Sequence, residues 1–338
     1  MSNDDQIRVV VAMDFSDEIM AQLRDISPRL HVERHFPDVP DAVWAETEVL
    51  YTVRNFPRPE AVPRLRWIQA HFAGIGSASS QPIFQAEDVE ITSGSGVHSV
   101  QMSEYTLAMM LAFHYKLPRM FADKNKAVWP EKQYQIYRPH SLRGLTLGIV
   151  GYGTIGRELA RMVNALGMTV LATKRDLKHT EEVDEYRIEG TGDPTGEIPE
   201  RIYPPEAVAT MARDCDFLVV IAPLTDETRH MINEDVFEAM PEHAILVNIA
   251  RGAVVDEAAL INALAAEKIG GAALDVFEEE PLPKGSPLWN LDNVIISPHV
   301  SGNTVNYHQK AADVFKANLQ RYLENKPLLN RYKRDAGY

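Results

Sequence analysis

The chain has 338 residues, a length that predicts two domains, because a single hydrophobic core seldom grows past roughly 250–300 residues. Its net charge of −14 argues against nucleic-acid and anionic-membrane partners, which need basic patches. The lone Cys215 rules out a disulfide framework or cysteine-based zinc site, and we expect no metal. The polar, acidic stretch Met1 to Gln6 is unlike a signal peptide, so we expect a cytoplasmic protein.

The first third of the chain alternates between short apolar runs and polar or helical segments. Strands are expected at 7–13, 49–53, 67–71 and 89–92. A short helical stretch containing Ile19 and Leu23 follows the first of them. This alternation is typical of a parallel sheet with helical crossovers.

The middle of the chain begins with a helix at 102–116 that is apolar nearly all round and is therefore expected to be buried. The stretch 124–143 is polar and aromatic, with Trp129 and Tyr134. We interpret it as an excursion that joins two domains or reaches a partner subunit.

From Leu145 the pattern becomes regular, with continuous apolar runs separated by helical segments. Strands are expected at 145–150, 169–173, 217–222, 244–249, 271–276 and 294–297. Such strands are typical of a doubly wound sheet covered on both faces. An exposed loop is expected at 176–206, and a C-terminal helix at about 303–324 should pack on the first domain.

A glycine-rich turn follows the strand at 145–150 and opens a helix. In this context Gly151, Gly153 and Gly156 predict a dinucleotide site, with the pyrophosphate held by amides around Thr154 and Ile155. The alternative is a glycine-rich turn without a ligand.

The strand expected at 169–173 is followed by two cations, Lys174 and Arg175. At this place NAD-binding proteins carry an acidic residue that binds the ribose 2′-OH. Cations bind a 2′-phosphate that an acid would repel, so NADP(H) is favoured, with NAD(H) possible. The alternative is that both are solvated charges on a turn.

Three ionisable residues follow later strands: Arg251, Glu280 and His299. The ligand crevice of an open α/β sheet lies beyond the carboxyl ends of its strands, so the three can converge there. Arg251 suits a carboxylate, His299 exchanges protons near neutral pH, and Glu280 can orient the imidazole and favour its charged form. Each alone is more often a surface charge or a turn residue; the combination downstream of the glycine turn favours catalysis.

The motifs Gly151–Gly156, Asn248-Ile-Ala-Arg251-Gly252, Leu274–Pro281 and Ser297-Pro-His299 resemble those of the D-isomer-specific 2-hydroxyacid dehydrogenases. The resemblance implies two Rossmann-like doubly wound domains with an active-site cleft between them. The substrate domain would comprise 1–101 and 300–338, and the dinucleotide-binding domain 102–299.

The same resemblance implies the activity: hydride transfer between NAD(P)H, with NADPH favoured, and a small 2-oxoacid or D-2-hydroxyacid. It assigns Arg251 to the substrate carboxylate and carbonyl, His299 to acid/base catalysis and Glu280 to its partner. It further implies carboxylate binding by the loop amides of Ala73 and Gly74, and a homodimer. Cofactor contacts are implied at Ala222, Pro223, Ile249, Ala250 and Asp275.

Some positions depart from the family pattern or limit the activity. Gly76 stands where the family often has an aspartate, and Lys174 replaces the acid of the NAD-using members. Glu280 argues against formate oxidation and Ala73 against phosphite oxidation. The alternative from another functional class is a dinucleotide-binding corepressor-like scaffold of the same fold; the chain has no long disordered tail for that role, which favours the enzyme.

Overall fold

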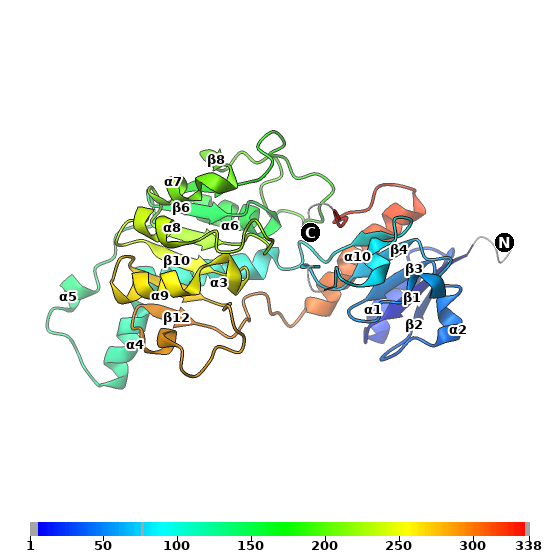
Figure 1. The fold of residues 1–338 in the computed structure, drawn as a ribbon, viewed down its shortest axis with the longest axis horizontal. Coiled ribbons are helices and arrows are strands. Elements are labelled where there is room, and N and C mark those ends of the chain that lie inside the picture. The colour runs from blue at the N-terminus through cyan, green and yellow to red at the C-terminus, as the bar shows by residue number, and fades with distance from the viewer. Residues whose placement is uncertain (1–5, 76–77, 335–338) are drawn as a thin grey trace. The chain divides into compact units, whose positions relative to one another are not determined.

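The computed structural model describes residues 6–75 and 78–334, which fold as two compact units (Figure 1). Unit 1 contains the chain up to Val97, the segment Val183–Ile188 and the chain from Thr304. Unit 2 contains His98–Glu182 and Glu189–Asn303. The short segment Val183–Ile188 therefore belongs to unit 1 although its neighbours in sequence belong to unit 2.

Unit 1 is built on a five-stranded parallel sheet in the order β2-β1-β3-β4-β5. Its strands are β1 (Ile7–Ala12), β2 (Leu30–Arg34), β3 (Val49–Thr52), β4 (Trp67–Ala70) and β5 (Glu90–Thr92). Its helices are α1 (Asp17–Arg24), α2 (Asp41–Trp44), α10 (Tyr307–Leu323) and the 3₁₀ turns η2 (Pro59–Ala61) and η3 (Pro82–Gln85). Leu23 of α1 and Phe315 of α10 are buried in one cluster with Val9 and Val11 of β1, so the C-terminal helix completes this core, as expected.

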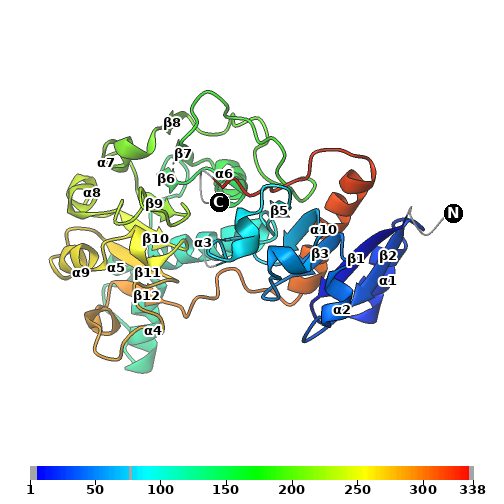
Figure 2. The same ribbon diagram turned by 45° about the vertical axis from the view of Figure 1, so that its right-hand side comes forward.

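Unit 2 carries a seven-stranded parallel sheet in the order β12-β11-β10-β9-β6-β7-β8, which runs from bottom to top in Figure 2. Its strands are β6 (Thr146–Val150), β7 (Thr169–Thr173), β8 (Arg201–Tyr203), β9 (Phe217–Val220), β10 (Ile245–Asn248), β11 (Gly271–Leu274) and β12 (Val294–Ile296). Its helices are α3 (Ser99–His114), α4 (Leu117–Asn125), α5 (Gln133–Ile136), α6 (Thr154–Ala165), α7 (Val208–Ala212), α8 (Glu234–Ala239) and α9 (Glu257–Ala265), with 3₁₀ turns η4 (Pro205–Ala207), η5 (Gly252–Val254) and η6 (Pro287–Asn290).

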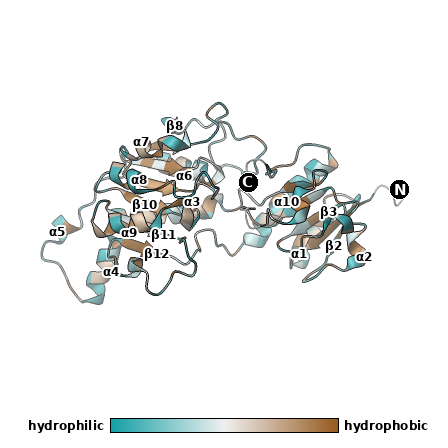
Figure 3. Cartoon of the chain, viewed as in Figure 1, coloured by the Kyte–Doolittle hydropathy of each residue, from teal (hydrophilic) through white to brown (hydrophobic). Residues whose placement is uncertain are grey.

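Successive side chains of these strands enter two different cores. Val150 and Leu218 pack in the cluster formed with α7, α8 and α9. Ile149 and Val219 pack in the cluster that contains residues of α3 and α6. Side chains alternate between the faces of a strand, so the strands must be apolar on both sides. Much of this sheet is brown, the hydrophobic end of the scale, in Figure 3. The predicted α/β class with doubly wound parallel sheets is confirmed.

The strands β2 and β8 were not predicted from the sequence. The segment 176–206 was predicted to be an exposed loop, but it contains β8 and a buried residue. β8 pairs with β7 over Leu171–Thr173 and extends the sheet. Asp193 of this segment is buried. At its tip, the amide of Tyr186 donates to Asn330 Oδ1 (2.8 Å), and the Asn330 amide donates to the Asp184 carbonyl (2.8 Å). The segment is thus an ordered excursion with contacts of its own.

The aromatic stretch that follows α3 contains the two short helices α4 and α5. Its large apolar side chains are turned outward: Trp129 is 85% exposed, Tyr134 is 84% exposed and Phe121 is also exposed. Over the described residues, none of the helices combines the length and the apolar character that crossing a membrane requires.

Candidate active site

The three glycines of the turn between β6 and α6 have different surroundings. Gly151 has a φ of +105°, and a Cβ there would lie 2.8 Å from the Ala222 nitrogen. A Cβ on Gly156 would lie 2.7 Å from the Gly151 carbonyl oxygen, so only glycine lets α6 pack this closely. A Cβ on Gly153 would meet nothing within 4 Å, so the space beside this residue is open.

This open space lies where a dinucleotide pyrophosphate binds in folds of this kind. Gly153 is the N-cap of α6, and Thr154 and Ile155 are in its first turn, where amide groups lack partners inside the helix. The turn is fixed from β7, because the Gly151 amide donates to Thr173 Oγ1 (3.1 Å) and the Tyr152 amide to the Thr173 carbonyl (3.0 Å). These residues fit the phosphates of a dinucleotide.

A buried polar network behind this turn was not anticipated from the sequence. The Tyr152 hydroxyl donates to Asp193 Oδ2 (2.6 Å), and burial raises the pKa of Tyr152 well above its ordinary value. The buried Arg157 guanidinium lies 4.8 Å from the centre of the Tyr152 ring and donates to the carbonyls of Thr180 and Asp193. The network ties the 176–200 excursion to the glycine turn; the signal for it was a tyrosine inside the motif and an arginine on the first turn of α6.

The two cations after β7 already have partners within the protein. Lys174 Nζ donates to the His179 carbonyl. Arg175 forms an ion pair with Glu227 (3.0 Å), and both side chains are exposed. Their assignment to a 2′-phosphate stays a prediction, and the pairing shows that a phosphate at Arg175 would compete with a carboxylate.

The predicted cofactor-lining backbone lies at the ends of β9 and β10. Ala222 contacts Gly151 closely, as described above, and Thr228 Oγ1 donates to the Pro223 carbonyl (2.6 Å), which fixes the turn that follows. Ile249 and Ala250 are buried directly after β10. These positions therefore lie at the carboxyl edge of the sheet.

Arg251 ends a turn that is held by hydrogen bonds among the residues Asn248 to Arg251. Asn248 Oδ1 accepts from the Ala250 amide (3.1 Å), and Arg251 Nη1 donates to the Ala250 carbonyl (2.6 Å). A Cβ on the next residue, Gly252, would lie only 1.9 Å from the Phe277 carbonyl carbon. Glycine is therefore required for the Arg251 turn to pack against the segment that leads to Glu280.

Glu280 and His299 form a direct pair. Glu280 Oε2 lies 2.8 Å from His299 Nδ1, and the side chains are 36% and 48% exposed. The other carboxylate oxygen of Glu280 accepts from the Phe277 amide (3.1 Å), which fixes the carboxylate. The pairing leaves Nε2 of His299 as the ring nitrogen for proton exchange.

The backbone of His299 is in the left-handed region, with a φ of +54° that is uncommon for a residue other than glycine. Its amide donates to the Asp275 carbonyl (2.9 Å). The Asp275 carboxylate is fully buried and accepts from Ser297 Oγ (2.5 Å) and from the amides of Val300 and Ser301 (both 2.8 Å). Asp275 thus holds the His299 loop in place; its predicted contact with the cofactor stays a prediction.

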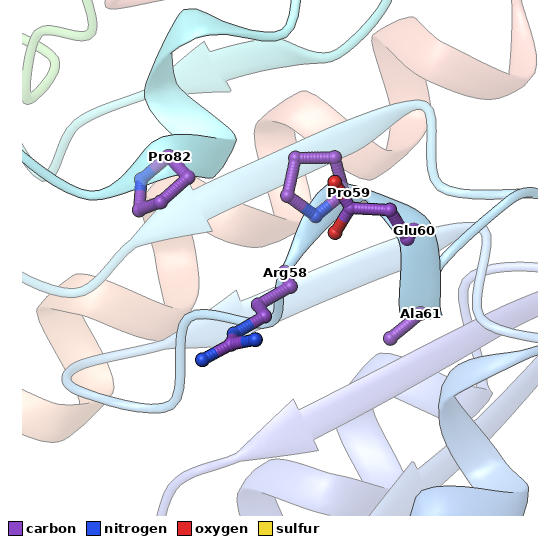
Figure 4. Close-up of a pocket in the computed structure, with 5 residues that line it drawn as sticks. All are labelled: Arg58, Pro59, Glu60, Ala61 and Pro82. Carbon is purple, nitrogen blue, oxygen red and sulfur yellow. The ribbon is translucent and has the colours of Figure 1, made fainter.

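Ala73 and Gly74 lie in unit 1, three and four residues beyond the end of β4. The preceding residue is fixed by the Gly94 amide, which donates to the Phe72 carbonyl (2.8 Å). Gly76, which departs from the family pattern, lies outside the described residues. A separate surface pocket in unit 1 is lined by Arg58, by Pro59, Glu60 and Ala61 of η2 and by Pro82 of η3, and none of the candidate site residues lines it (Figure 4).

Over the described part of the chain, no cluster of three or more His, Cys, Asp or Glu side chains is arranged to hold a metal ion. One parallel sheet carries these groups beyond the carboxyl ends of its strands: the glycine turn follows β6, Arg251 follows β10, and the paired Glu280 and His299 follow β11 and β12. Hydride-transfer chemistry on a dinucleotide needs this combination of a phosphate cradle and an acid/base group.

Comparisons with known proteins agree with this geometry. The sequence profile of the D-isomer specific 2-hydroxyacid dehydrogenase NAD binding domain matches residues 107–301. A glyoxylate reductase of Thermofilum pendens is 32% identical over 266 residues, which are 77% of this chain and 72% of that protein. A D-3-phosphoglycerate dehydrogenase of Methanocaldococcus jannaschii is also 32% identical, over 70% of this chain, but this chain spans only 43% of its length.

Among solved structures, a D-isomer specific 2-hydroxyacid dehydrogenase from Xanthobacter autotrophicus Py2, in complex with NADPH and MES, superposes with a TM-score of 0.79. It is 27% identical, and the match covers 98% of this chain and all of the other. The chain therefore belongs to the D-isomer-specific 2-hydroxyacid dehydrogenase family and is an NAD(P)-dependent oxidoreductase of that family.

Proposed function

We propose that this protein is an NADPH-dependent reductase of small 2-oxoacids that forms D-2-hydroxyacids. The observation that carries the proposal is the 2.8 Å contact between His299 Nδ1 and Glu280 Oε2 at the carboxyl edge of the dinucleotide-binding sheet. A glyoxylate reductase among the relatives favours glyoxylate and similar short 2-oxoacids as substrates.

The substrate carboxylate is held by charge and by backbone amides. The planar guanidinium of Arg251 presents paired donors that match a carboxylate, and the amides of Ala73 and Gly74 add neutral donors. Binding at the carboxylate orients the adjacent carbonyl, which converts an encounter into a positioned reaction.

The proton is carried by His299. Glu280 accepts a hydrogen bond from the Nδ1–H group, which keeps its proton, and so stabilises the imidazolium. Nε2 then donates its proton to the carbonyl oxygen as negative charge develops there. When bound, the nicotinamide supplies the hydride. In the oxidative direction His299 accepts the hydroxyl proton at Nε2.

The proposed preference for NADPH rests on the end of β7. This strand runs into Lys174 and Arg175 rather than into a carboxylate. The NADPH in the structure of the Xanthobacter relative supports the same choice. We expect the preference to be moderate, because Glu227 pairs with Arg175 and would compete with the 2′-phosphate.

We further propose a homodimer in the cytoplasm. The exposed Phe121, Trp129 and Tyr134 around α4 and α5 are large apolar side chains of the kind that subunit interfaces cover.

The direct test is the oxidation of NADPH on addition of glyoxylate, hydroxypyruvate, pyruvate or a branched 2-oxoacid. We expect rapid turnover with at least one short 2-oxoacid. Tight NADPH binding with negligible turnover across the panel would contradict the proposal and favour a scaffold role.

A further inference from the structure

The loop that carries Ala73 and Gly74 begins at the His71 carbonyl, which no longer takes part in the sheet. The His71 amide still donates to the Thr52 carbonyl of β3 (2.8 Å), so the chain is in sheet register up to this point. The His71 carbonyl oxygen instead accepts a hydrogen bond from the Tyr307 hydroxyl (2.9 Å). Tyr307 is the first residue of α10, so the C-terminal helix of unit 1 reaches back to the start of the loop.

The same carbonyl is confined from a second side by β5 and the residues after it. A Cβ on Gly94 would lie 2.8 Å from the His71 oxygen, and the Gly94 amide donates to the next carbonyl, that of Phe72 (2.8 Å). Two consecutive carbonyls before Ala73 therefore each have a fixed partner.

The side chain of His71 is also fixed. Its Nδ1 lies 2.6 Å from the Tyr51 hydroxyl in a buried contact, and its ring packs edge-on against the Tyr307 ring with centroids 4.9 Å apart. Tyr307 thus contacts His71 through both its hydroxyl and its ring.

We propose that Tyr307 is a positioning residue for the 2-oxoacid carboxylate: its hydroxyl holds the His71 carbonyl and thereby aims the amides of Ala73 and Gly74. This inference rests on the proposed function, because it takes the two amides as the carboxylate-binding groups. Tyr307 acts through the loop and does not itself contact the substrate in this scheme.

The Tyr307 hydroxyl is chemically suited to this positioning role. Burial raises the pKa of Tyr307 to about 12, so the group stays a protonated donor across the working range of the enzyme. A carbonyl acceptor beside a neutral hydroxyl gives a pH-independent bond, which is appropriate for a fixed scaffold.

The first measurement is amide hydrogen exchange of the segment 71–75 in the full-length protein, which does not depend on activity. In Tyr307→Phe the ring contact is retained and only the hydroxyl is lost. We expect exchange in this segment to become several-fold faster. The matched control is Tyr322→Phe, on the same helix, which loses a hydroxyl bond to Glu48 (2.8 Å) and should leave the segment unchanged.

The second measurement is steady-state kinetics with the best 2-oxoacid of the wild-type enzyme. Tyr307→Phe should raise KM for the 2-oxoacid roughly three- to tenfold, the effect of one neutral hydrogen bond, with Kd for NADPH unchanged and kcat changed less than KM. Gly94→Ala, which displaces the same carbonyl sterically, should change KM in the same direction. Tyr322→Phe should have wild-type kinetics.

Unchanged exchange at 71–75 in Tyr307→Phe would overturn the inference. So would a wild-type KM in Tyr307→Phe, or an equal KM increase in Tyr322→Phe, which would indicate general destabilisation. If the wild-type enzyme reduces none of the 2-oxoacids, the proposed function fails, and the exchange experiment alone still decides whether Tyr307 holds the loop.

Discussion

The proposed catalytic pair, Glu280 and His299, and the two cations Lys174 and Arg175 all follow strands of the unit 2 sheet, but the protein fixes the two sets differently. In the proposed pair, both carboxylate oxygens of Glu280 have partners and the His299 loop is anchored by the buried Asp275. At the end of β7, Lys174 and Arg175 are bound to a loop carbonyl and to the exposed Glu227.

The difference indicates which functional groups of this fold are held in a fixed geometry. Proton transfer and carboxylate binding require a fixed geometry, so their groups are attached to buried backbone. Recognition of a phosphate depends mainly on charge and less on fixed geometry, so exposed cations such as Arg175 can serve it. Mutations at the first region should therefore have large effects, and mutations at the second should be moderate and sensitive to salt.

The largest effect is expected for His299→Ala, which removes the proton donor. We expect kcat for the reduction to fall by about 10²–10⁴-fold, the usual contribution of a general acid, while Kd for NADPH stays close to wild type. Measuring kcat and NADPH binding on one preparation checks both. An active His299→Ala enzyme would show that the proton comes from elsewhere.

Arg251→Ala should lower kcat/KM by about two orders of magnitude, on the order of 3 kcal/mol, because the substrate carboxylate loses a charge-assisted, bidentate partner. Arg251→Lys should recover part of the loss, since the charge returns without the planar fork. Steady-state kinetics over a range of 2-oxoacid concentrations give the values. A near-normal Arg251→Ala enzyme would remove this residue from the substrate site.

Glu280→Gln should leave measurable activity and lower kcat for the reduction. Glu280 Oε2 lies 2.8 Å from His299 Nδ1, so the change removes the negative charge that orients the imidazole and balances its positive form during proton transfer. The check is kcat at saturating NADPH and 2-oxoacid in both enzymes, and an unchanged kcat would show that the carboxylate does not assist His299.

The smallest effect is expected at the end of β7. Lys174→Asp combined with Arg175→Ala should lower kcat/KM for NADPH and raise the relative use of NADH, because an acid accepts from a free 2′-OH and repels a phosphate. Glu227→Gln is the matched opposite, since it frees Arg175 and should increase the NADPH preference. Both changes should weaken as ionic strength rises. A wild-type preference for NADH would refute the assignment of Lys174 and would not affect the proposed roles of Glu280 and His299.

The sequence predicted best the features that depend on neighbouring residues, which are the strands and the glycine turn. All six strands predicted from residue 145 onward are confirmed, and the glycine spacing predicted the turn at Gly151–Gly156. The pairing of Glu280 with His299 followed from their positions after neighbouring strands.

What the sequence did not predict depends on contacts between distant segments. β8 has only three residues within a polar stretch, so its pattern is too short to read. The Tyr152–Asp193 bond and the contact of Tyr307 with His71 join residues 41 and 236 positions apart, and no local periodicity reports such pairs. Asp275 was placed correctly at a strand end, but which groups its carboxylate binds emerged only in three dimensions.

The most direct test of the proposed chemistry is to supply NADPH carrying deuterium at both C4 positions together with hydroxypyruvate. Analysis of the product by chiral chromatography and mass spectrometry should show D-glycerate with one deuterium at C2, formed by wild type and lost in His299→Ala. Formation of the L-enantiomer, a product without deuterium at C2, or no product with this or any other short 2-oxoacid would contradict the assignment of this site as a D-specific 2-oxoacid reductase.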